Sequence, residues 1–205
     1  MTRSHRLVPS ALPRLSQRIA ARLLAVFGWH VHFAPLPGPH GVFVVYPHTS
    51  NWDFVVGMFA KIATGVQIRW LGKEALFSGP LFGFWFGPLM RRLGGEPVVR
   101  SSSTGAIERL AQRMHAADSF WLALTPEGTR SYSPYWRSGF YHIALAADVP
   151  VALAFIDYGH KEIGFVEHIR LTGDVEADMA RIRAAYADCR GYRHELAAPI
   201  IFKED

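Results

Sequence analysis

The sequence predicts a single α/β domain with a mostly parallel central sheet flanked by helices. Short stretches rich in Val, Leu, Ile and Phe alternate with longer stretches of helical periodicity, which is typical of strand–helix–strand units. Several of the short stretches are apolar throughout, as expected of strands covered on both faces. At 205 residues the chain is long enough for one such domain and too short for two.

The expected elements follow one another from residue 41 onward. Strands are expected at 41–46, 66–72, 96–100, 120–125, 150–157 and 163–171. Helices are expected at 53–63, 103–117, 137–147 and 174–189. Residues 1–38 precede this pattern and end in a Pro/Gly-rich stretch, so we interpret them as an N-terminal segment appended to a domain formed by residues 39–205.

The N-terminal segment is basic and amphipathic. The chain carries a net charge of +5, and residues 1–52 contain five Arg and neither Asp nor Glu. On a helix, one stripe would consist of Arg14, Arg18 and Arg22, and an adjoining apolar stripe of Leu15, Ile19, Leu23, Val26 and Phe27. This combination favours a helix lying on an anionic membrane surface, rather than a nucleic-acid partner. A helix packed on its own domain, with solvated arginines, is the alternative.

No segment is expected to cross a bilayer. The longest uninterrupted apolar run, ALFSGPLFGFWFGPLM, has 16 residues, two Pro and three Gly, whereas a spanning helix needs roughly 20 apolar residues. The lone Cys189 cannot form an internal disulfide, which suits a reducing compartment. We therefore expect a peripheral or monotopic protein on the cytoplasmic face of a membrane.

Two junctions between a strand and the segment that follows it carry the candidate chemistry. The first reads YPHTSNWDF, where His48 lies on the turn and Asp53 lies in the first turn of a helix capped by Ser50 or Asn51. From the turn, His48 can meet Asp53, whose carboxylate would orient the imidazole and leave its other nitrogen to accept a proton. His-x4-Asp alone is a weak pattern, and a histidine that merely satisfies a helix terminus is the alternative.

The second junction follows strand 120–125 and reads PEGTRS. Gly128 permits a tight turn, and Glu127 and Arg130 are expected to project from it. An arginine beside exposed backbone N–H groups suits a phosphate or a carboxylate. A Glu–Arg pair that only stabilises the turn is the alternative.

Taken together, these residues resemble the glycerolipid acyltransferase family, which includes the lysophosphatidic acid acyltransferases. Four blocks appear in the family's order and cover roughly residues 40 to 157. They are HTSNWD (48–53), GGEPVVR (94–100), PEGTR (126–130) and VPVAL (149–153). One departure is Pro47, because many members have Asn directly before the catalytic histidine.

The resemblance implies an enzyme of phospholipid biosynthesis that acts without a metal or other cofactor. The acyl donor would be acyl-CoA or acyl carrier protein, and the acceptor a lysophospholipid or related glycerolipid. His48 would be the general base and Asp53 its partner. The substrate-binding residues would be Arg100, Glu127, Gly128, Thr129 and Arg130.

Other functions remain open at this stage. The acceptor could be a lipid without glycerol, because subgroups of the family acylate different head groups. A hydrolase would need an activated nucleophile; Ser50 lies near His48, but the chain has no Gly-x-Ser-x-Gly motif. Cys189 lies in a helical, charge-rich stretch, which does not favour a nucleophile. A non-catalytic membrane adaptor is the remaining alternative.

Overall fold

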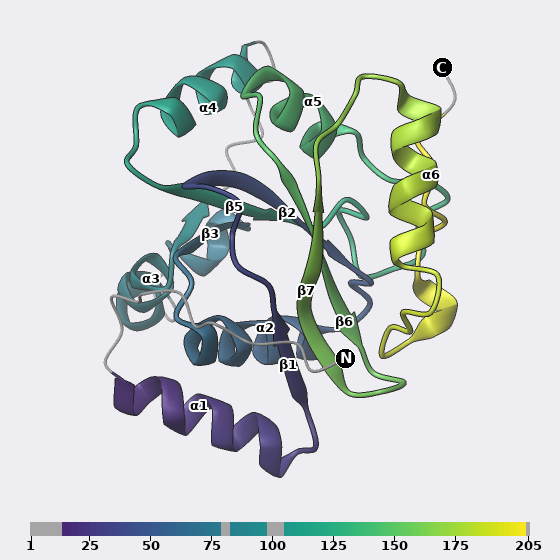
Figure 1. Cartoon of the computed structure of the whole chain (residues 1–205). Helices are drawn as coiled ribbons and strands as arrows, with labels where there is room; N and C mark the ends of the chain where they lie inside the picture. Colours follow the sequence, from purple (N-terminus) through teal and green to yellow (C-terminus); the bar gives the residue numbers. More distant parts are fainter. Residues whose placement is uncertain (1–13, 79–82, 98–104, 204–205) are drawn as a thin grey trace.

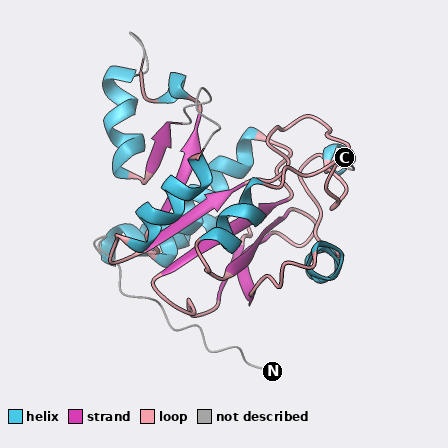
Figure 2. Ribbon diagram, turned by 90° about the horizontal axis from the view of Figure 1, so that it is seen from above, coloured by secondary structure: helices cyan, strands magenta, loops and turns pink. Residues whose placement is uncertain are grey.

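A seven-stranded twisted sheet runs through the middle of the described part of the chain, with helices around it (Figures 1 and 2). The computed structural model describes residues 14–78, 83–97 and 105–203. The strands are β1 (His30–Phe33), β2 (His40–Tyr46), β3 (Ile68–Gly72), β4 (Gly95–Pro97), β5 (Phe120–Leu124), β6 (Val151–Asp157) and β7 (Glu162–Ile169). Their order is β1-β7-β6-β2-β5-β3-β4, and only β6 and β7 pair antiparallel.

Six α-helices and two short 3₁₀ helices are present in the described residues. The α-helices are α1 (Arg14–Val26), α2 (Asn51–Thr64), α3 (Gly83–Arg92), α4 (Ala106–His115), α5 (Gly139–Ala146) and α6 (Val175–Ala185). The 3₁₀ helices are η1 (Glu74–Leu76) and η2 (His194–Leu196). The predicted fold class, a mostly parallel sheet flanked by helices, is confirmed.

The core lies on both faces of the sheet. Figure 1 shows α1 and α2 on one side and α4, α5 and α6 on the other. On the second side, Met114 of α4, Phe140 of α5 and Ile182 of α6 are at most 2% exposed. On the first side, Leu24 of α1 and Ala60 of α2 pack with apolar residues of β6 and β7. Burial on both faces explains why the central strands are apolar throughout.

Apart from the 3₁₀ helices, one described strand and one described α-helix are not predicted from the sequence. β1 lies within the N-terminal segment of residues 1–38 and pairs parallel with β7, and Trp29 just ahead of it is buried. That part of the segment therefore belongs structurally to the sheet. α3 overlaps the apolar run of residues 75–90, for which the sequence excludes a bilayer-spanning helix and predicts no other element, and it contains Pro88. The helix expected over 174–189 ends earlier, at Ala185.

Candidate active site

Three neighbouring strands deliver the residues of the site. β2 lies between β6 and β5 and is parallel to both, so the three carboxyl ends meet at one edge of the sheet. His48 follows β2, Glu127 follows β5 and Tyr158 follows β6. Ligands of open α/β sheets bind at this edge. Residues that are distant in sequence are thereby brought together.

The turn Pro47–Ser50, called here the catalytic turn, is built by the capping of α2. Ser50 is the N-cap residue, and its hydroxyl accepts the N–H of Trp52. In return, Asp53 Oδ2 accepts the N–H groups of Thr49 (2.7 Å) and Ser50 (2.8 Å). This reciprocal arrangement is a capping box. It leaves Asn51 as the first-turn residue whose N–H has no acceptor among the described residues.

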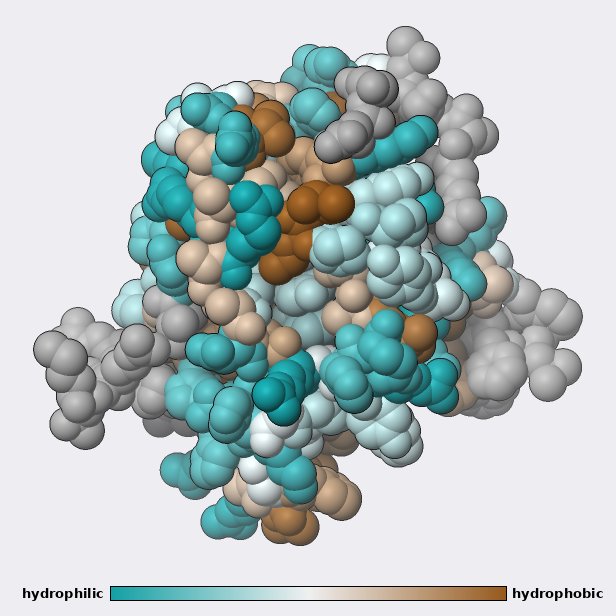
Figure 3. All heavy atoms as spheres, turned by 90° about the vertical axis from the view of Figure 1, so that its right-hand side faces the viewer, coloured by the Kyte–Doolittle hydropathy of each residue, from teal (hydrophilic) through white to brown (hydrophobic). Residues whose placement is uncertain are grey.

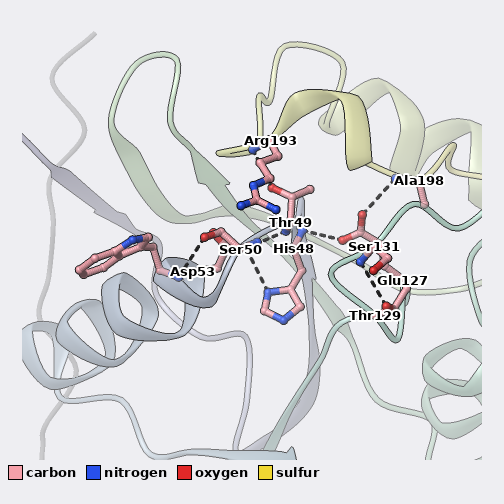
Figure 4. A network of polar contacts seen from close by, with 10 residues as sticks. His48, Thr49, Ser50, Asp53, Glu127, Thr129, Ser131, Arg193 and Ala198 are labelled. Carbon is pink, nitrogen blue, oxygen red and sulfur yellow. Dashed lines mark hydrogen bonds and ion pairs between the residues drawn. The ribbon is translucent and has the colours of Figure 1, made fainter.

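The same carboxylate meets His48. Asp53 Oδ2 lies 3.2 Å from His48 Nδ1, and the side chains of the two residues are 0% and 15% exposed. A carboxylate at Nδ1 favours the tautomer that carries the proton there, so Nε2 is left as the basic nitrogen. In Figure 4 that second nitrogen points away from Asp53. The structure thus brings together the two residues that the sequence predicted as a pair.

Tyr158 lies behind this pair. Its hydroxyl and Asp53 Oδ1 are both buried, and neither has a hydrogen-bond partner of good geometry among the described residues. Burial, followed by the charge of the nearby Asp53 carboxylate, raises the pKa of Tyr158 far above its usual range. The tyrosine therefore stays protonated and is the donor available to the otherwise unsatisfied carboxylate oxygen. Its ring makes edge-to-face contacts with the rings of Trp29 and Tyr192.

Glu127 joins three segments of the chain. It is 2% exposed; Oε2 accepts the N–H of His48 at 2.5 Å and Oε1 accepts the N–H of Ala198 at 3.0 Å. Burial raises the pKa of this carboxyl, and the two N–H donors oppose that rise. The sequence expectation that Glu127 contacts the acceptor stays a prediction. In the structure both oxygens are already engaged, linking the PEGTR turn to the catalytic turn and to the C-terminal segment.

The remaining predicted substrate residues surround the same turn. Gly128 has a φ of +66°, and a Cβ there would lie 2.4 Å from Arg137 Nε, so the position strongly favours glycine. Thr129 accepts the N–H of Ser131 through its hydroxyl. Arg130 is exposed. Arg100 lies outside the described residues.

A polar pocket of about 440 Å³ opens beside the catalytic turn. It is lined by Thr49, Ser50, Asn51, Trp52, Arg130, Ser131, Tyr192 and Arg193. The last two come from the C-terminal segment, which sequence analysis assigned no role. Tyr192 and Arg193 lie in no pattern that sequence reasoning could have used, and only the fold places them here.

The two side chains considered as nucleophiles are poorly suited to that role. Burial, followed by the charges of Asp157, Asp188 and Glu162, raises the pKa of Cys189 to about 12, so its thiol stays protonated near neutral pH. The Ser50 hydroxyl is engaged as the cap of α2. His48 therefore has no activated protein nucleophile in either residue, and the arrangement suits a base that acts directly on a substrate hydroxyl.

An α/β fold with a His–Asp pair and a cationic pocket at the carboxyl edge of its sheet suits an enzyme that deprotonates a hydroxyl of an anionic substrate. A family model described as "Acyltransferase" matches residues 29–154, more than half of the chain. The chain belongs to this family, that of the glycerolipid and lysophosphatidic acid acyltransferases. No individual curated protein matches the sequence significantly. Tyr158, Tyr192 and Arg193 lie beyond the matched residues.

Proposed function

We propose that the protein transfers a fatty acyl group from acyl-CoA or acyl carrier protein to a hydroxyl of a lysophospholipid or related glycerolipid. Membership of the family supports acyl transfer in general. The observation that carries the finer proposal is the contact between His48 Nδ1 and Asp53 Oδ2, which leaves Nε2 without a partner among the described residues. That geometry suits a base that deprotonates an incoming hydroxyl.

The reaction proceeds by direct transfer. His48 Nε2 takes the proton of the acceptor hydroxyl as its oxygen attacks the thioester carbonyl carbon. The tetrahedral intermediate then collapses, the carbon–sulfur bond breaks, and the imidazolium returns the proton to the leaving thiolate. Asp53 stabilises the imidazolium in between. The free N–H of Asn51, at the positive end of the α2 dipole, is available to the oxyanion.

The cationic residues hold the acceptor's anionic group. Arg130 lines the pocket beside the catalytic turn, and its guanidinium has no carboxylate partner among the described residues. Arg100 takes the same role in the family pattern. Gly128 and Thr129 give the PEGTR turn the shape that presents Arg130.

The protein lies on a membrane through α1. Leu15, Ile19, Leu23, Val26 and Phe27 are 39–79% exposed on this helix and the residue after it, whereas Ala20 and Leu24 face the domain. Arg18 and Arg22 are exposed beside them. Such a helix suits an anionic interface. By contrast, the face that carries α6 is largely hydrophilic, apart from small apolar patches (Figure 3).

The acyl chain follows apolar residues between Leu76 and Leu89, of which residues 79–82 lie outside the described part of the chain. Leu76, Phe86 and Leu89 are 43–50% exposed, and this stretch includes part of α3. A contiguous patch of exposed apolar side chains on a folded protein marks a site of contact with lipid or with a partner protein. No described helix is both long enough and apolar enough to span a bilayer. A protein lying on the membrane surface would receive its lipid substrates directly from the bilayer.

A single-turnover assay tests this proposal. The purified protein receives acyl-CoA or acyl carrier protein with a labelled acyl group, together with lysophospholipids, lysolipids without phosphate, or amino lipids. We expect an acylated lysophospholipid only when donor and acceptor are both present. Free fatty acid released at the same rate without an acceptor would instead show a hydrolase, and product formed only with amino lipids would overturn the glycerolipid assignment.

A further inference from the structure

The pocket beside the catalytic turn is a cationic site with walls from two parts of the chain. Arg130 comes from the PEGTR turn, and Arg193 comes from the C-terminal segment, 63 positions later. Among the described residues, no Asp or Glu lines the pocket. Neither guanidinium has a hydrogen-bond or ion-pair partner among the residues that the structure describes. Two unpaired arginines facing one pocket are a binding arrangement for an oxyanion.

The backbone fixes the position of Arg193 independently of its side chain. The N–H of Arg193 donates to Thr49 Oγ1 on the catalytic turn at 3.1 Å. Gly191 packs so closely on the same threonine that a Cβ there would lie 2.7 Å from Thr49 Oγ1. The carbonyl of Arg190 accepts the N–H of Tyr158 at 2.8 Å. The C-terminal loop is therefore held against the catalytic turn, and Arg193 lines the pocket together with Thr49 and Ser50 of that turn.

The lining is suited to phosphate. Guanidinium groups bind phosphate oxygens in a bidentate manner, and the pocket also includes Asn51 and Trp52 at the N-terminus of the 14-residue helix α2. The two carboxylates bonded to the turn, those of Asp53 and Glu127, are buried and engaged by backbone N–H groups, and neither lines the pocket.

We propose that Arg193 is a specificity-determining residue that binds, together with Arg130, a phosphate group of one of the two substrates. This inference rests on the proposed transfer at His48, and it adds a residue outside the part of the chain that the family model matches. The phosphate has two sources with the same chemistry: the head group of the acceptor and the phosphopantetheine portion of the donor.

Kinetics of Arg193→Gln distinguish the two sources. This variant removes the charge and keeps the backbone N–H that bonds Thr49, so the loop stays in place. Losing one charge-assisted contact should raise by roughly tenfold the KM of the substrate that brings the phosphate, with kcat little changed. If the acceptor brings the phosphate, the KM of a phosphate-free acceptor should not change. If the donor brings it, the KM of the donor should rise with every acceptor. Arg193→Lys should recover part of the loss.

Arg190→Gln is the matched control, because it removes the same charge from the same loop and does not line the pocket. It should leave both KM values within about twofold of wild type. The inference is overturned if Arg193→Gln changes neither KM by more than about twofold, or if Arg190→Gln raises KM as much as Arg193→Gln.

A binding measurement without turnover separates this inference from the proposed function. Inorganic phosphate should protect the wild-type protein against thermal unfolding in a concentration-dependent manner, and Arg193→Gln should weaken that protection. If transfer is absent but this difference is seen, the phosphate site stands and the proposed function fails. If transfer is normal and phosphate protects both proteins equally, the proposed function stands and the inference fails.

Discussion

Glu127 accepts the backbone N–H of His48 through Oε2, at 2.5 Å, while its other oxygen holds Ala198. The carboxylate of the PEGTR turn thus supports the residue that carries the imidazole. It does not project into the neighbouring pocket, whose lining it does not join. Support for His48 and binding of an acceptor are different roles, and they predict different kinetics.

Replacing Glu127 with Ala should destabilise the protein and lower kcat. Two buried N–H groups would lose their acceptor, at about 1–3 kcal/mol each, and the catalytic turn would lose its support. Thermal melts and steady-state kinetics check this. Glu96→Ala is the control, because Glu96 also holds two partners, Arg69 and Arg113, away from the site. A raised acceptor KM with an unchanged melting temperature would instead place Glu127 in contact with the acceptor.

Tyr158→Phe should lower kcat several-fold and leave the acceptor KM unchanged. Without the hydroxyl, the buried Asp53 carboxylate loses its interaction with Tyr158 and holds His48 less firmly. Tyr141→Phe is the control, because it removes a hydroxyl that donates to the buried Asp178 at 2.8 Å on the opposite side of the sheet. Both variants should lose stability, and only Tyr158→Phe should lose turnover. If the Tyr158→Phe and Tyr141→Phe variants had the same kcat, Tyr158 would have a structural role alone.

Exposed apolar residues of the first helix should govern membrane binding. Changing Leu23, Val26 and Phe27 to Ser should reduce flotation with anionic vesicles by tenfold or more, since each buried apolar side chain contributes about 1.5–3 kcal/mol. Val175→Ser with Ile201→Ser removes exposed apolar residues from other parts of the protein and should have little effect. Unchanged flotation of the triple variant would move membrane contact to α3 and the residues before it.

Cys189 should be slow to react with a thiol reagent. A pKa of about 12, against an ordinary value of 9.0, means that its thiolate fraction at pH 8 is lower by about a thousandfold than that of an unperturbed cysteine. The labelling rate in the folded protein should rise with pH up to the limit of stability, and denaturant should abolish the protection. Cys189→Ala should retain transfer activity. Fast labelling at pH 8 that also abolishes activity would restore the nucleophile hypothesis.

The predictable parts of the fold are those with local signals. Apolar stretches predict β2, β3, β5, β6 and β7, and the stretch expected at 96–100 overlaps β4, although its residues 98–100 lie outside the described part of the chain. β1 was missed because its four residues, HVHF, are too few and too polar, and their burial depends on pairing with the distant β7. α3 was missed because Gly87 and Pro88 lie inside it, and helix propensity argues against both.

In the site, too, residues placed by local sequence are predictable, and residues placed by distant contacts are not. His48 and Asp53 are found from sequence because the strand, turn and helix cap that place them are contiguous. Tyr158 and Arg193 follow no motif; they reach the site only through the β2–β6 pairing and the bond from Arg193 to Thr49. Glu127 was identified, but its burial was not, because its partner Ala198 is 71 residues away. Long-range contacts decide what these side chains do.

The central claim is that His48 is the general base, and His48→Ala tests it most directly. His160→Ala is a matched control, because His160 forms the chain's other close histidine–aspartate contact among the described residues: Nδ1 lies 2.6 Å from Asp157 Oδ2 on an exposed hairpin. Initial rates of acyl transfer are measured for both variants, with melts to confirm folding. We predict a loss of roughly 10²–10⁴-fold for His48→Ala and near-normal rates for His160→Ala. A folded His48→Ala protein that keeps more than about a tenth of the wild-type rate would contradict the account.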